Sequence, residues 1–312
     1  MYTIKQPKKI LFGINACQNF KFPDNVLLIT SKGAKSRGWI EYLNLNNFSL
    51  FDLVESNPSI ETINEILSNF NQNFSAVVGL GGGSSLDVSK FVGNKLKIPK
   101  ILIPTTFGSG SEVTRISVLK VDGKKKSFHD DNLFSDVAIV DPYFIKNTPI
   151  EIIRNSAIDA CAQCTEAFDS KNANIYTKFL CLHAFEILEK AIAEKNFHDL
   201  AYGSMISGLG FGNSSTTLGH ALSYVFSNEG ISHGHALAFT TTVAHKFNNS
   251  IFYNRFLNLV KSFGFEKINF TGNLDDAAEL ILSDKKHLDN NPRDVKKMDL
   301  ITLLKSINNY DF

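Results

Sequence analysis

The stretch IDACAQC, residues 158–164, holds two pairs of side chains that could do chemistry. Cys161 and Cys164 form a CxxC, a spacing found in zinc sites and redox disulfides. Asp159 and Gln163 are four residues apart, so on a helix an acid and an amide would lie on one face. Only one of these pairs can face a functional site.

Helical geometry separates the two pairs. Each residue turns by about 100°, so relative to Asp159, Gln163 lies at about 40° and Glu166 at about −20°, whereas both cysteines lie opposite. A zinc site would need a second cysteine pair, which Cys17 and Cys181 do not form. We therefore expect the cysteines to be small core residues and the acid and amide to face the site.

A glycine-rich turn occurs in GLGGGSSLDVSK, residues 79–90. The apolar run SAVVGLG (75–81) predicts a buried strand, and a helix is expected to begin near Ser84 or Ser85. Glycines let a ligand approach the backbone, and the N–H groups at a helix start suit a pyrophosphate. The turn matches neither GxGxxG nor the P-loop, so a plain strand–helix turn is the alternative.

A second polar loop, PTTFGSGSEVT (104–114), follows the next apolar run, KILIPTT (100–106). Its hydroxyl side chains and glycines offer donors for a ribose, a phosphate or an amide, although a solvated loop would have a similar composition. Two such loops after successive strands favour a bound dinucleotide.

The predicted secondary structure changes along the chain, from alternating strands and helices to helices alone. The apolar runs 25–31, 75–81, 100–106 and 137–142 alternate with helical patterns, which predicts a parallel sheet covered on both faces. Helical patterns then follow one another at 151–168, 173–194, 198–212, 236–248, 251–263 and 274–283. We predict an α/β dinucleotide-binding domain over residues 1–148 and an all-helical domain over 149–312, with the site in the cleft between them.

Composition narrows the class of protein. The balance of 32 basic and 31 acidic residues gives no footprint for nucleic acid or a charged membrane surface. No segment has the roughly 18 consecutive apolar residues of a membrane span, and the N-terminus lacks a signal-peptide pattern. We expect a cytoplasmic protein that acts on a small molecule.

Three motifs in order, GGGSSLDVSK, IPTTFGSGSEVT and DPYFIKNTP, resemble the metal-dependent (group III, iron-containing) alcohol dehydrogenases, which share the dehydroquinate synthase-like fold. The resemblance continues through the helical half. It implies a nucleotide domain, a helical domain and a divalent metal, Fe²⁺ or Zn²⁺, in the cleft. It also implies a set of cofactor-binding residues: Gly81, Gly82, Gly83 and Ser84 at the pyrophosphate, Asp87 as helix cap, Thr105, Thr106, Ser109 and Ser111 at the nicotinamide ribose, and Lys126.

The turn after the first predicted strand bears on the choice of cofactor. Family members that prefer NAD tend to place an acid there, which would repel a 2′-phosphate. Here the turn reads Thr30-Ser31-Lys32, and a serine and a lysine can accept a phosphate. We predict NADP(H), with NAD(H) as the alternative if Lys32 is a solvated surface residue.

The metal ligands of the family map onto this chain with departures. Relatives use an acid and a histidine four residues on, which fall at Asp159 and Gln163, so an amide replaces one imidazole. His233, in HGHA, matches the last ligand. The position four residues before His220 is Thr216, so that ligand is replaced or shifted, and His220 could take its place. An oxygen-rich set suits a harder or weakly held metal.

The resemblance implies reduction of an aldehyde by a nicotinamide, with the metal polarising the carbonyl and His220 or His235 relaying a proton. HALSY followed by GISHGHA is most similar to the phosphonoacetaldehyde reductase branch, which implies a small anionic aldehyde. Arg115, Lys126 and Lys90 are the candidate partners for the anion. A carbocycle-forming lyase and a non-catalytic nucleotide-binding descendant are the alternatives, and a homodimer is a family expectation.

Overall fold

In the first half of the chain, short apolar runs form a six-stranded parallel sheet. The structure, a computed structural model, describes residues 1–146 and 148–309. The strand order is β1-β8-β5-β4-β2-β3, and every pairing is parallel. The strands are β1 (Lys9–Phe12), β2 (Val26–Ile29), β3 (Phe48–Phe51), β4 (Ala76–Gly81), β5 (Lys100–Pro104) and β8 (Val137–Val140).

Helices cover both faces of this sheet, because alternate strand residues are apolar on both sides. Val26 and Leu28 pack with Trp39 and Ile40 on one face. Leu27 and Ile29 lie on the other face. The helices α1 (Gly33–Ser36) and α2 (Trp39–Tyr42) cover the first face, and α3 (Ile60–Asn69) and α4 (Gly83–Leu96) cover the second. All four residues of β2 are buried, as expected for a central parallel strand.

The strand order reverses at β2, which pairs with β3 on one side and β4 on the other. In open α/β sheets, ligands bind beyond the carboxyl ends of the strands at such a point. The glycine turn follows β4 and the hydroxyl loop follows β5, at the same edge. The topology therefore places both predicted ligand-binding loops where a nucleotide would lie.

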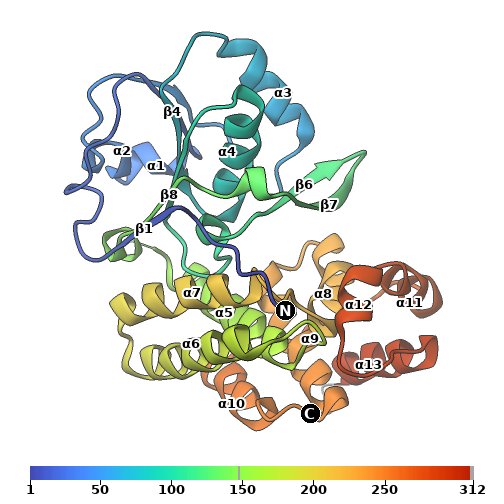
Figure 1. The fold of residues 1–312 in the computed structure, drawn as a ribbon. Coiled ribbons are helices and arrows are strands. Elements are labelled where there is room, and N and C mark those ends of the chain that lie inside the picture. Colours follow the sequence, from blue (N-terminus) through green and yellow to red (C-terminus); the bar gives the residue numbers. More distant parts are fainter. Residues whose placement is uncertain (147, 310–312) are drawn as a thin grey trace.

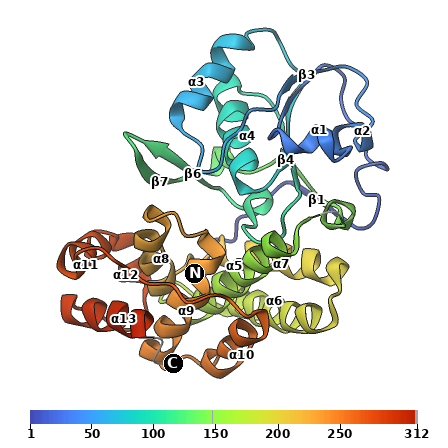
Figure 2. The same ribbon diagram turned by 180° about the vertical axis from the view of Figure 1, so that it is seen from behind.

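An antiparallel hairpin projects from the α/β half over the helices (Figures 1 and 2). It consists of β6 (Ile116–Val121) and β7 (Lys124–His129). Asp122 and Gly123 join the strands with φ of 52° and 74°, the left-handed pair that a two-residue hairpin turn requires. Lysine-rich β7 gave no apolar pattern, so the sequence did not predict this hairpin.

The second half is helical throughout its described residues. Its helices are α5 (Ile150–Asp169), α6 (Ile175–Glu194), α7 (Phe197–Phe211), α8 (Leu218–Asn228), α9 (His233–Asn248), α10 (Tyr253–Phe263), α11 (Leu274–Leu282), α12 (Lys285–Asn290) and α13 (Lys297–Asn309). Cys161, Cys164 and Cys181 are free and lie in the core, as expected. Among the described helices, none has the length and apolar character that a membrane crossing demands.

The fold class predicted from the sequence is confirmed, and the four predicted strands form within a residue or two of their expected ends. Not predicted were β1, β3, the hairpin, α1, α2, α8, α12 and α13. The domain boundary after residue 148 stays a prediction.

Asp87 does not cap α4, contrary to expectation. The N-cap of α4 is Gly82, and no side chain caps the helix. Asp87 lies in the helix and accepts hydrogen bonds from Ser111 Oγ (2.6 Å) and Val118 N (2.8 Å). Its carboxylate is also 3.6 Å from the buried Nζ of Lys90. Asp87 thus ties α4 to the hydroxyl loop and to β6.

Replacing Asp87 with alanine would remove the carboxylate 3.6 Å from the buried Lys90 ammonium and leave Glu112, whose pKa burial raises to about 7, as the remaining acid acting on it. We expect the D87A change to lower the free energy of unfolding by about 3–5 kcal/mol, measured by urea denaturation. Asp24→Ala, at an exposed position, is the matched control and should change it by less than about 0.5 kcal/mol. Equal stability of D87A and D24A would contradict this role.

Candidate active site

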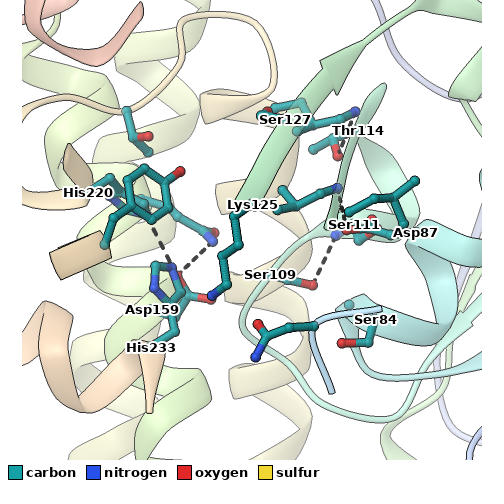
Figure 3. A pocket seen from close by; sticks show the side chains of 18 of the residues that line it. Ser84, Asp87, Ser109, Ser111, Thr114, Lys125, Ser127, Asp159, His220 and His233 are labelled. Atoms are coloured by element: carbon teal, nitrogen blue, oxygen red, sulfur yellow. Dashed lines mark hydrogen bonds and ion pairs between the residues drawn. The ribbon is translucent and has the colours of Figure 1, made fainter. Parts of the chain in front are cut away.

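A cavity of about 230 Å³ lies between the two halves (Figure 3). Gly83, Ser84, Ser109 and Ser111 line it from the α/β half. The helical half contributes most of the predicted metal residues: Asp159, Gln163, Thr216, His220 and His233. The structure therefore brings the cofactor loops and the metal motif to one cleft.

Three side chains converge as a possible metal centre. Asp159 Oδ1 is 3.8 Å from His220 Nε2 and 3.8 Å from His233 Nε2. One atom of each side chain lies within 4.8 Å of the others. Two atoms that each bind an ion at about 2.1 Å can be up to about 4.2 Å apart, so each carboxylate–imidazole pair fits one ion. The donor set, two imidazoles and one carboxylate, suits a divalent transition metal such as iron.

Glu166 fixes the orientation of His220. Its carboxylate accepts from His220 Nδ1 at 2.9 Å and from the backbone N–H of Thr217 at 2.7 Å. The proton on Nδ1 leaves Nε2 facing Asp159, the arrangement typical of metal-binding histidines. Gly219 is required here, because a Cβ at this position would overlap Glu166 and Thr241. The sequence indicated Glu166 through helical spacing, which places it on the same face as Asp159.

The two imidazoles differ electrostatically. Burial alone would lower the pKa of His220, but the carboxylates of Glu166 and Asp159 outweigh it and raise the pKa to about 9. The His233 side chain is 37% exposed, and its partial burial in the cleft wall lowers its pKa to about 4, so this ring is neutral and able to donate a lone pair.

Gln163 lies beside this group. Its Nε2 donates to Asp159 Oδ1 at 2.9 Å, and its buried Oε1 has no hydrogen-bond partner among the described residues. An unpaired buried amide oxygen next to three candidate ligands is a donor that a cation would satisfy. The sequence left one ligand position open between Thr216 and His220. Thr216 lines the cavity, and His220 belongs to the candidate ligand group.

A second cavity, of about 270 Å³, lies at the carboxyl edge of the sheet. Its lining includes the predicted cofactor residues Ser31, Gly82, Gly83, Ser84, Thr105 and Thr106. Gly83 and Ser84 line both cavities. An extended molecule such as a dinucleotide could therefore reach from the sheet edge into the cleft.

The glycine turn fits tightly against the hydroxyl loop. A Cβ on Gly82 would lie 3.0 Å from Thr106 Oγ1, and one on Gly83 would lie 3.0 Å from Ser109 Oγ. Gly81 has φ of 150°. Because no side chain caps α4, its first N–H groups are available to a phosphate. These features fit the pyrophosphate site that the sequence predicted.

Two predicted cofactor lysines lie elsewhere. Lys32 is exposed and does not line the second cavity, where Arg37 and Glu55 stand instead. The Lys126 ammonium lies over the Phe128 ring, whereas its neighbour Lys125 lines the cleft. Figure 3 shows Lys125 extending from the hairpin across the cleft. If the hairpin had been predicted, the alternation of side chains along β7 would have shown that Lys125 and Lys126 point in opposite directions.

His235 lies outside the cleft cavity. Its Nε2 is 2.6 Å from the backbone oxygen of Glu266, and its ring packs near Phe239 and Phe265. His235 and His233 are two residues apart on α9, so their side chains point in nearly opposite directions. The structure therefore does not bring His235 to the candidate metal group.

The predicted anion partners are also engaged elsewhere. Lys90 Nζ is buried and donates to the backbone oxygen of Ile116 at 2.6 Å. Arg115 pairs with Asp131 at 2.7 Å. Lys120, Lys125 and Lys286 line the cleft instead.

Two family descriptions match the chain: iron-containing alcohol dehydrogenase over residues 7–142, and the C-terminal domain of Fe-containing alcohol dehydrogenases over 153–282. Together they span most of its length. The chain belongs to the iron-containing alcohol dehydrogenase family.

Individual relatives resemble parts of the chain. The 4-hydroxybutyrate dehydrogenase of Clostridium kluyveri is 34% identical over 57% of this chain and 56% of its own length. Long-chain-alcohol dehydrogenase 1 of Geobacillus thermodenitrificans is 36% identical over 53% of this chain and 49% of its own. The matched region thus spans about half the length of these curated relatives.

A solved structure matches over nearly the whole chain. Sulfoacetaldehyde reductase from Bifidobacterium kashiwanohense, in complex with NAD⁺, has a TM-score of 0.88 and 25% identity, covering 99% of each chain. An iron-containing alcohol dehydrogenase from Thermotoga maritima has a TM-score of 0.90 at 23% identity, covering 99% of this chain and 100% of its own, which supports the fold.

Changing Gln163 to histidine would add a third imidazole to the group. We expect Q163H to bind Zn²⁺ at least about tenfold more tightly, equivalent to about 1.4 kcal/mol, in competition with a chromophoric chelator. Gln18→His, at an exposed position, is the control. Unchanged zinc affinity in Q163H would show that position 163 does not contact the ion.

Replacing Lys125 with methionine should weaken cofactor binding, because this lysine takes the place in the cleft that the sequence assigned to Lys126. We expect about a tenfold rise in the dissociation constant of NADPH, measured by nucleotide fluorescence, for the loss of one charge-assisted hydrogen bond. The K126M variant should bind like the unchanged protein. The reverse pattern would restore Lys126 as the cofactor contact.

Proposed function

We propose that the protein is a metal-assisted, NAD(P)-dependent dehydrogenase that interconverts a small aldehyde and its primary alcohol. The observation that carries this proposal is the position of Asp159, His220 and His233 across one cleft from the glycine turn. The two cavities that meet at Gly83 and Ser84 provide room for a dinucleotide beside the metal group.

The residues that would hold the metal are Asp159, His220 and His233, with the Gln163 amide beside them. When bound, the ion supplies a Lewis acid for the carbonyl oxygen, and the nicotinamide supplies the hydride. Glu166 keeps the His220 ring oriented through Nδ1. Gly83 and Ser109 shape the opposite wall. The enclosing walls limit water at the reacting atoms.

NADP(H) is the cofactor we propose, with NAD(H) as the alternative. Ser31 lines the second cavity together with Arg37, whose guanidinium lies over the Trp39 ring with 5.0 Å between them. An arginine in this region suits a 2′-phosphate. Glu55 lines the same cavity, and an acid suits an unmodified ribose.

The finer parts of the proposal concern the substrate and the setting. A small anionic aldehyde, with phosphonoacetaldehyde as one candidate, is consistent with the cleft lysines Lys120, Lys125 and Lys286. The names of two relatives, 4-hydroxybutyrate dehydrogenase and sulfoacetaldehyde reductase, point to the same chemical class. A cytoplasmic location and a homodimer stay predictions.

The decisive experiment is consumption of NADPH or NADH with a panel of aldehydes, with and without Fe²⁺, Zn²⁺ or Mn²⁺. We expect metal-dependent turnover, and we expect His220→Ala to lose bound metal in elemental analysis. No consumption under any condition would overturn the dehydrogenase. Bound metal or tightly held cofactor without net turnover would favour the lyase, and loss of both functions would favour the nucleotide-binding descendant.

A further inference from the structure

A third cavity adjoins the cleft on the side away from the cofactor loops. It has a volume of about 410 Å³ and shares Ile116, Phe211, Ser215 and Lys286 with the cleft cavity. It shares none of the described residues that line the cavity at the sheet edge. The cleft therefore adjoins two different cavities, one on the cofactor side and one on the side of α12.

A dinucleotide bound at the glycine turn would fill the cofactor side. It would extend from the sheet-edge cavity past Gly83 and Ser84 toward the metal group. A route separate from the cofactor would let a second reactant reach the cleft. The third cavity supplies that route, and Lys286 stands where it meets the cleft.

The charged side chains that line the third cavity are basic. No carboxylate is among the described residues that line the third cavity, whereas Arg115 and Lys286 both line it. Arg115 already pairs with Asp131 at 2.7 Å. The Asp284 carboxylate acts electrostatically on Lys286, but it pairs with His287 Nδ1 at 2.6 Å and forms no ion pair with Lys286 among the described residues. Its ammonium donates to Ser127 Oγ at 3.2 Å and also contacts His129 Nε2.

The cleft itself does not neutralise Lys286. Asp87 and Asp159 are the carboxylates among its lining residues. Asp87 is held by Ser111 and Val118, and Asp159 belongs to the metal group. Lys286 is exposed on its solvent side; partial burial lowers its pKa to about 8, opposed by the Asp284 carboxylate, and this leaves it mostly protonated at neutral pH. A cation between two cavities is thus available to a ligand.

We propose that Lys286 binds the anionic group of the substrate, which enters through the third cavity, and so selects short aldehydes that carry a carboxylate, sulfonate or phosphonate. This assignment rests on the proposed dehydrogenase function and identifies a specificity-determining residue for it. Ser127 and His129 hold the Lys286 side chain across the cleft from α12 to β7.

The dimensions limit the length of such a substrate. His287, the neighbour of Lys286, has its ring centroid 6.3 Å from that of His220, a candidate metal ligand. Asp284 holds His287 in place through Nδ1 at 2.6 Å. Lys286 and the candidate metal group line the same cavity of about 230 Å³, which suits a short aldehyde.

The test compares an anionic aldehyde with its neutral isostere in the metal-loaded protein. We would measure kcat/KM for 4-oxobutanoate and for 4-methylpentanal, in which an isopropyl group replaces the carboxylate. K286M should lower the anionic-to-neutral ratio by about 10- to 100-fold, mainly through KM, the effect of losing one charge-assisted hydrogen bond. K286R should largely preserve it. K285M, an exposed neighbour that lines none of the three cavities, should behave like the unchanged protein.

An unchanged ratio in K286M, or an equal loss for both aldehydes, would overturn the assignment. Sulfoacetaldehyde and phosphonoacetaldehyde, compared in the same assay, distinguish the three anion types. If no aldehyde is reduced, the dehydrogenase proposal fails by itself. Binding of ethanesulfonate, followed by saturation-transfer NMR, then decides the anion site alone: weaker binding in K286M but not K285M supports it, and equal binding refutes it.

Discussion

The carboxylate of Glu166 is buried in the helical half, where its side chain is 1% exposed. A buried charge costs several kcal/mol unless it is paired and hydrogen-bonded. The Thr217 N–H and the His220 imidazole meet this requirement, and both belong to the start of α8. Glu166 therefore locks α8 against α5 and turns His220 toward Asp159. This contact links Asp159 and Glu166 on α5 to His220 on α8.

The opposite wall of the cleft depends on a similar contact. Asp87, buried in α4, joins the hydroxyl loop through Ser111 and the hairpin through Val118. Because α4 begins at the glycine turn, this contact also fixes the turn relative to the hairpin. Each wall is thus held by one buried carboxylate, and the reacting groups lie between two rigid surfaces. Preorganisation of this kind is what transition-state stabilisation requires.

Much of the α/β half was predictable because its central strands are buried on both faces. Apolar runs such as VLLI in β2 have no other explanation in a chain of this composition. β1 and β3 were missed because they are short and partly exposed, and β7 because its lysines hide the alternation. Edge strands and hairpins take their stability from partners that a single segment does not reveal.

The candidate site was predictable to the extent that its residues share an element or a motif. Helical spacing placed Asp159, Gln163 and Glu166 on one face, and the resemblance supplied His220 and His233. Lys286 had no such signal. It meets Ser127 across a separation of 159 residues, and only the packing of α12 against the hairpin brings them together. Because the contact joins two segments that are far apart in the sequence, no pattern within either segment reveals it.

The departures from the family pattern that the resemblance implies lie on the metal side of the cleft. The glycine turn and the hydroxyl loop keep the form expected for a dinucleotide, with glycine required at Gly82 and Gly83 by the close approach of Thr106 and Ser109. Gln163, in contrast, is an amide where the resemblance implies an imidazole, and its buried Oε1 has no hydrogen-bond partner among the described residues. Lys286 adds a cation to the lining of the same cavity. A site that binds its metal less strongly gains more from a substrate held at a second point, because the anion contact then supplies part of the orientation that metal coordination would otherwise give.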